Sequence, residues 1–216
     1  MVDFFVKGGI FMWPLLLALI AGVVIIIIKF WTLFRASINT KKFMKKLKES
    51  LSTGSIEGAV ELCESTRGPV AAILHAGLIR AKRGVEYVEK SIEDAATLEM
   101  SFLERGMVWL ATVANIAPMI GFLGTVSGMI HAFEAIAKAG EVEPTLVATG
   151  ISEALITTAT GLAIAIPVQA FYNYFVSKID RLIIDMEESS TDMVETLTET
   201  GLSKEGKPSK VGERVA

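Results

Sequence analysis

A stretch of 21 residues without a charge, from Gly8 to Ile28, constrains the fold of this chain more than any other feature. As an α-helix it would be roughly 31 Å long, which matches the thickness of the hydrocarbon core of a bilayer. It runs directly into Lys29, Phe30 and Trp31, a basic and aromatic boundary typical of a membrane interface. A signal peptide would have a shorter apolar region and a cleavage site with small residues. We therefore expect a retained membrane-spanning helix.

Two further apolar blocks are also long enough to cross a bilayer. Gly106–Phe133 contains no Asp, Glu, Lys or Arg over 28 residues, and Pro144–Ser177 is interrupted by one charged residue, Glu153. Hydrophobic residues make up 51% of the chain and are concentrated in these blocks. The sequence therefore predicts three transmembrane helices.

The distribution of basic residues indicates how these helices are oriented. Between the first and second blocks lie 13 Lys and Arg residues, whereas the short connection after Phe133 contains only Lys138. Because segments rich in Lys and Arg stay in the cytoplasm, we expect the N-terminus outside, and residues 29–105 and the C-terminal tail inside.

The segment between the first two spans is expected to be helical, because its apolar residues recur at spacings of three and four. Helix breaks are predicted at Ser52–Ser55 and at Arg67–Pro69, where capping residues, Gly and Pro occur. From Gly84 to Arg105 we find no breaker, so this helix is expected to continue into the second span as one long helix that projects from the membrane.

The chain is thus predicted to be an all-α integral membrane protein with a helical cytoplasmic domain. In chain order, we expect an N-terminal segment with the first span (1–34), a cytoplasmic domain (35–105), the second span (106–135), a periplasmic loop (136–143), the third span (144–177), a cytoplasmic helix (178–200) and a disordered tail (201–216).

Composition excludes several classes of function. The 21 Lys and Arg residues and 24 Asp and Glu residues leave a net charge of −3, which argues against a nucleic-acid binder. A single cysteine and two histidines exclude a disulfide-built fold and a His/Cys metal site. No nucleophile with a neighbouring base and no H-E-x-x-H motif is present, so we expect neither an enzyme nor a cofactor. The basic run Lys41–Lys48 fits either contact with membrane lipids or a solvated face that enforces topology.

Glu153 is the most informative residue for function, because an ionisable side chain in a span usually faces a partner helix or an ion pathway. Thr149, Thr157 and Thr160 share its helical stripe at spacings of four, four and three. A simpler interpretation is that Glu153 only reaches toward the interface or caps a polar loop.

Two stripes of small residues, each with one hydroxyl, accompany Glu153 in the predicted spans. The third span carries Ala154, Thr158, Gly161 and Ala165, and the second carries Ala111, Ala114, Pro118, Gly121, Thr125, Gly128 and Ala132. Such stripes let a neighbouring helix or a pore-filling partner approach closely, although they are equally typical of plain helix packing. Pro118 and Pro167 each remove a backbone hydrogen bond and favour a kink.

Two long motifs resemble the ExbB/TolQ/MotA proton-channel family, and most closely its ExbB and TolQ branch. The second span reads APMIGFLGTVSG over residues 117–128, similar to the family pattern A-P-x-x-G-x-x-G-T-V-x-G. The third reads ISEALITTATGL over residues 151–162, followed by AIP at 165–167 and FYN at 171–173, similar to I-x-E-A-L-x-x-T-A-x-G-L, A-I-P and Y-N. The resemblance covers residues 5–200.

The resemblance implies a homopentamer in the bacterial inner membrane. Its second and third spans would surround a lumen that holds the single spans of an ExbD-like or TolR-like dimer, and a TonB-like or TolA-like protein would carry work to the outer membrane. Thr125 and Thr158 would be lumen-facing hydroxyls near the partner's intramembrane Asp, and Glu153 would be the family's third-span glutamate. The small neighbours Gly121, Gly124, Gly128 and Gly161 would let the partner helices turn or slide.

Thr157 departs from the common proton-type pattern, in which Ala often precedes the threonine. An extra hydroxyl resembles sodium-driven stators, so Na⁺ bound at Thr157 and Thr158 stays open beside the favoured H⁺. The sequence is also compatible with an envelope-maintenance motor of the TolQ type, a MotA-like stator, a gliding or polysaccharide machine, and a membrane scaffold that conducts nothing.

Overall fold

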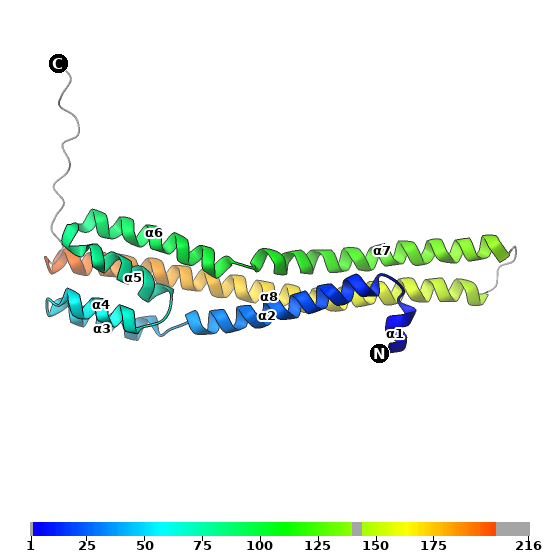
Figure 1. Cartoon of the computed structure of the whole chain (residues 1–216), viewed down its shortest axis with the longest axis horizontal. Helices are drawn as coiled ribbons and strands as arrows, with labels where there is room; N and C mark the ends of the chain where they lie inside the picture. Colours follow the sequence, from blue (N-terminus) through cyan, green and yellow to red (C-terminus); the bar gives the residue numbers. More distant parts are fainter. Residues whose placement is uncertain (1, 140–143, 202–216) are drawn as a thin grey trace, which may run out of the picture. The chain divides into compact units, whose positions relative to one another are not determined.

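The computed structural model describes residues 2–139 and 144–201, and every element in these residues is a helix (Figure 1). The elements in chain order are α1 (Val2–Lys7), α2 (Met12–Ala36), α3 (Thr40–Ser52), α4 (Ile56–Ser65), α5 (Pro69–Arg80), the 3₁₀ helix η1 (Ala81–Arg83), α6 (Val85–Glu104), α7 (Met107–Ala139) and α8 (Pro144–Glu199). Residues 140–143 of the loop expected at 136–143, and residues 202–216 of the tail expected at 201–216, lie outside the described residues.

Three helical stretches contain segments long and apolar enough to cross a membrane, namely Met12–Ser52, Val85–Lys138 and Val147–Glu199. The predicted all-α fold with three candidate membrane spans is therefore confirmed. The chain divides into two compact units, one formed by the residues up to Trp31 together with Arg105–Val176, the other by Thr32–Glu104 together with the residues from Ser177 onward.

In the first unit, α2 packs against α7 and α8. A Cβ atom added to Gly22 of α2 would lie 3.3 Å from Cγ1 of Val113 and 3.2 Å from Cγ2 of Val168, so the absence of a side chain lets the helices approach. Large apolar side chains point away from this unit and are exposed, among them Trp13, Leu17, Val108, Trp109, Met119 and Phe122. An apolar exterior of this kind suits contact with lipid tails.

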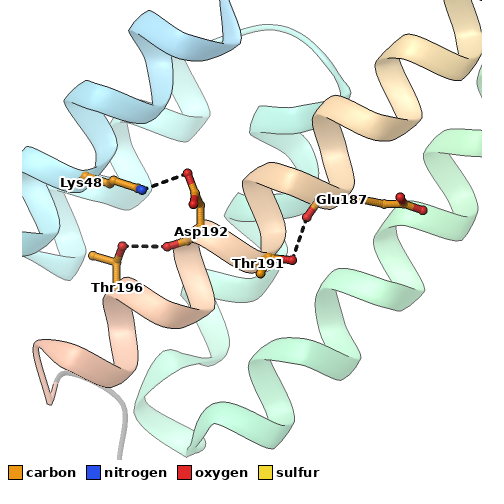
Figure 2. Close-up of polar contacts among 5 residues, drawn as sticks. All are labelled: Lys48, Glu187, Thr191, Asp192 and Thr196. Atoms are coloured by element: carbon orange, nitrogen blue, oxygen red, sulfur yellow. Dashed lines mark hydrogen bonds and ion pairs between the residues drawn. The ribbon is translucent and has the colours of Figure 1, made fainter.

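In the second unit, α8 contributes an apolar stripe that is buried against the shorter helices. Its members follow spacings of three, four, seven and four, as expected for one helix face: Ile179, Leu182, Met186, Met193 and Leu197. At the edge of this contact, Nζ of Lys48 on α3 lies 2.9 Å from a carboxylate oxygen of Asp192 (Figure 2). Nearby, the Thr40 hydroxyl donates to Asp185 at 3.2 Å.

The predicted breaks between the short helices are confirmed, and local chemistry explains them. The side chain of Asn39 accepts from the backbone N–H of Lys42 and caps α3. Ser55 accepts from Gly58 N–H in the same way and caps α4. Pro69 is the first residue of α5, where its missing N–H removes no helical hydrogen bond.

The expectation of one continuous helix from Gly84 into the second span is wrong. α6 ends at Glu104 and α7 begins at Met107, with a turn between them in which Gly106 has a φ of +89°. Only glycine adopts this left-handed backbone without a steric penalty. The Gly106 carbonyl accepts from Leu110 N–H at 3.3 Å, so this residue also starts α7.

Candidate functional site

The two predicted stripes of small residues meet each other along α7 and α8. A Cβ atom added to Gly121 would lie 3.2 Å from Cα of Thr158, and one added to Gly161 would lie 2.6 Å from the carbonyl oxygen of Ala117. Backbones can come this close only where side chains are absent or small. We expected these stripes to accommodate a partner helix as well, but within this chain Gly121 and Gly161 are occupied by the contact between α7 and α8.

The hydroxyl groups of Thr125 and Thr158 form a hydrogen bond across this contact. The Thr158 hydroxyl also lies 3.0 Å from the carbonyl oxygen of Gly121 and 3.1 Å from that of Ala154. Both threonines are half-buried, so they are neither sealed in the core nor open on the surface. The structure thus brings together the two hydroxyls that the sequence placed on separate spans.

Thr157 is fully buried, unlike its neighbour Thr158. Its hydroxyl donates to the carbonyl oxygen of Glu153 at 2.6 Å, one turn earlier in α8, and lies 3.4 Å from the carbonyl oxygen of Gly8. A Cβ added to Gly124 of α7 would lie 2.5 Å from Cγ2 of Thr157, so this glycine makes room for the threonine. Thr157 is therefore held inside the chain by hydrogen bonds to carbonyl groups.

Glu153 is half-buried and lies nine residues after Pro144, the first residue of α8. Its carboxyl group lies against Gly9 in the turn between α1 and α2. Helical periodicity did not predict this contact. The signal that could have found it is the pair Gly8–Gly9, placed at the start of an apolar block that otherwise favours a continuous helix.

The two other threonines of the Glu153 stripe donate to carbonyl groups of their own helix. Thr149 donates to the carbonyl oxygen of Thr145 at 2.9 Å, and Thr160 donates to that of Ile156 at 2.7 Å. Pro118 and Pro167 lie inside α7 and α8, and both helices continue through them. The hydrogen bond between spans therefore involves Thr125 and Thr158 rather than these threonines.

This arrangement suits the movement of a small cation. A carboxylate can bind and release a proton, and hydroxyls that both donate and accept can extend a hydrogen-bonded path. Among the described residues, no group of three or more His, Cys, Asp and Glu side chains lies close enough to hold a metal ion. The hydroxyls of Thr157 and Thr158 lie within hydrogen-bond distance of backbone carbonyl oxygens.

Comparison with known proteins gives a clear family match. Residues 65–188, more than half of the chain, match the MotA/TolQ/ExbB proton channel family. The match includes α7 and the part of α8 that carries Glu153 and Thr158.

Individual relatives agree with this match. An ExbB homologue among the biopolymer transport proteins, from Methanothermobacter thermautotrophicus, is 31% identical over 86% of this chain and 66% of its own length. An ExbB-like biopolymer transport protein of Synechocystis is 30% identical over 89% of the chain and 74% of its own length. The Tol-Pal system protein TolQ of Haemophilus influenzae is 48% identical over a shorter part, 37% of the chain and 35% of its own length. The chain spans only part of the length of these relatives.

Proposed function

Because the chain belongs to the MotA/TolQ/ExbB proton channel family, we propose that it is the channel-forming subunit of an ion-driven motor in the inner membrane of a bacterium. Five copies would form the channel. The motor would be of the ExbB type and would use an ion gradient to energise transport across the outer membrane.

The observation that carries this proposal is the hydrogen bond between Thr125 and Thr158, in a helix pair that also carries the carboxyl group of Glu153. A carboxylate in an apolar span is energetically unfavourable and usually marks an ion pathway. Here it lies five residues before Thr158 on α8, in a helix pair with an apolar exterior. Both hydroxyls belong to half-buried side chains, and a partner's carboxylate would reach them from the side that this chain does not cover.

The mechanism follows from the chemistry of these groups. Glu153 would take up a proton from the outer side and release it toward the threonine hydroxyls. Thr125 and Thr158 would exchange the hydrogen bond that joins them for one to the intramembrane carboxylate of a single-span partner. Neutralising that carboxylate removes its need for polar contacts, so the partner helix can move to the next subunit.

The names of the relatives support specific partners. Two relatives named for ExbB align over most of this chain, at 86% and 89%, and another ExbB and a TolQ align over shorter parts, at 46% and 37%. We therefore favour an ExbB-type system, with an ExbD-like dimer in the lumen and a TonB-like protein that reaches the outer membrane. A TolQ-type motor with TolR-like and TolA-like partners is the second candidate.

The arrangement in the membrane is part of the proposal. The excess of Lys and Arg in residues 29–105 supports a cytoplasmic location for that segment, for residues 178–200 and for the tail, with the N-terminus outside. The transported ion would be H⁺, as the match to a proton channel family suggests.

The test is to replace Glu153 by Gln in cells that depend on this chain for outer-membrane transport. Gln keeps the size of the side chain and removes its charge, so we expect transport to stop while the complex still assembles. Glu188→Gln is the matched control, because Glu188 is an exposed residue of the same helix. Normal transport with Glu153→Gln, or loss of assembly together with transport, would favour a scaffold that conducts nothing.

A further inference from the structure

We propose that the Gly8–Gly9 turn before α2 positions the side chain of Glu153, with Gly9 leaving the space that the carboxyl group occupies. Gly9 is thus a positioning residue that acts through Glu153. This inference rests on the proposed role of Glu153 in ion passage.

The space at Gly9 is matched to the carboxyl group. A Cβ atom added to Gly9 would overlap Oε1 of Glu153 and would lie 2.9 Å from its Cδ and 3.5 Å from its Cγ. Oε1 and Cδ of Glu153 therefore lie where a larger residue would clash, whereas Cγ is at ordinary contact distance. The φ of Gly9 is +67°, in the left-handed region that glycine enters without a steric penalty.

Gly8 holds the same turn against the next residues of α8. Its carbonyl oxygen lies 3.4 Å from the Thr157 hydroxyl, and a Cβ added to it would lie 3.2 Å from Cγ2 of Ile156. The turn is closed by hydrogen bonds from Gly9 N–H to the Val6 carbonyl at 3.4 Å and from Met12 N–H to the Gly9 carbonyl at 3.3 Å. The Gly8–Gly9 turn therefore lies against the part of α8 from Glu153 to Thr157.

This contact limits where the carboxyl group can go. A glutamate side chain rotates about three bonds, and on a half-exposed helix face it would populate several rotamers. Because α8 lies on one side of the Glu153 side chain and the Gly8–Gly9 turn on the other, fewer of these rotamers are accessible. Because proton transfer depends steeply on the placement of the reacting groups, ion flow should depend on a turn that itself carries no titratable group.

The experiment compares Gly9→Ala with Gly201→Ala in the complete complex, reconstituted in lipid vesicles. Gly201 has nearly the same backbone, with a φ of +64°, and no atom lies within 4 Å of its added Cβ. Gly201→Ala therefore introduces the same strain of a positive φ, but no clash with a neighbouring side chain. We expect Gly9→Ala to lower proton flux by ~10-fold or more and Gly201→Ala to leave it at the wild-type level.

Infrared difference spectroscopy supplies a readout that does not depend on flux. The carboxyl C=O band of Glu153 is identified by its loss in Glu153→Gln. We expect this band to shift in Gly9→Ala and to stay unchanged in Gly201→Ala. An unshifted band in Gly9→Ala overturns the proposal, whatever the flux. If Glu153→Gln keeps full flux, the proposed function fails, and the band still decides whether Gly9 positions the carboxyl group.

Glu153→Asp separates positioning from a general structural role. Asp is shorter by one methylene group, so its carboxyl carbon takes the place of Cγ of Glu153, which is in ordinary contact with the added Cβ at 3.5 Å. We expect Gly9→Ala to reduce flux no further when it is combined with Glu153→Asp. A full additional loss would overturn the proposal, and so would failure of the double variant to assemble where Glu153→Asp alone assembles.

Discussion

Thr125 on α7 and Thr158 on α8 are hydrogen-bonded to each other through their side-chain hydroxyls. The bond joins residues 33 positions apart, and it lies where glycines bring the two backbones together. Each hydroxyl also lies within 3.4 Å of the carbonyl oxygen of Gly121. The pair is therefore one unit with a shared acceptor, and neither threonine should act independently of the other.

Replacing either threonine by Val tests this coupling, because Val has nearly the same shape and no hydroxyl. We expect Thr125→Val and Thr158→Val each to reduce ion flux, and the double variant to be little worse than either single one. In a double-mutant cycle the coupling energy should be about 1 kcal/mol or more. Fully additive losses would show that the hydroxyls act separately.

The close contact of α7 and α8 predicts a strong effect of added volume at Gly161. In Gly161→Ala the new Cβ would lie 2.6 Å from the carbonyl oxygen of Ala117, and backbone cannot move aside as a side chain can. We expect a loss of about 1 to 3 kcal/mol in stability, seen as a lower unfolding temperature in detergent. Ala163→Val, at an exposed position of the same helix, is the control and should change little.

Cys63 should be unreactive in the folded protein. Its side chain is buried, with 3% of its surface exposed, and this burial raises the pKa of the thiol from 9.0 to about 12. The reactive thiolate is therefore scarce near neutral pH, and we expect maleimide to label the chain only after unfolding.

The same shift of the Cys63 pKa predicts how stability depends on pH. The unfolded thiol ionises at its ordinary value, below the folded one, so the stability contributed by burying the neutral thiol is complete below pH 9.0 and is lost as the pH rises toward about 12. In Cys63→Ala this part of the pH dependence should disappear. Rapid reaction of maleimide with Cys63 in the folded wild type at neutral pH would contradict the buried position of the thiol.

Thr157→Ala distinguishes the two candidate ions. Because the Thr157 side chain is fully buried within the chain, we expect flux at fixed pH to be the same with and without Na⁺, in both wild type and variant. A Na⁺ dependence that is present in the wild type and lost in Thr157→Ala would instead show that this hydroxyl coordinates Na⁺.

The spans could be predicted from the sequence because the signal for each is local. A block of about 20 residues without a charge is typical of a membrane-spanning helix. The position of Thr158 in its stripe of small residues follows from helical periodicity alone. The breaks at Ser55 and Pro69 were likewise predictable, because capping residues act on their immediate neighbours.

The features that the sequence did not reveal depend on contacts between distant residues. Helical periodicity predicted a face of small residues on each of the two spans. It did not predict that Gly121 and Gly161 on these faces would pack against each other within the same chain. A single glycine such as Gly106 is compatible with a continuous helix, and only the turn actually formed shows its left-handed backbone. The Gly8 turn contacts Thr157, 149 residues away in the sequence, and no local pattern encodes such a pairing.

The proposed ion pathway runs through Glu153. The most direct test measures proton flux into vesicles that contain the complex of this chain with its single-span partner, under an imposed pH gradient. With Glu153→Gln at unchanged assembly, we predict flux at the level of protein-free vesicles. Flux equal to that of the wild type in Glu153→Gln would contradict an ion pathway through this residue.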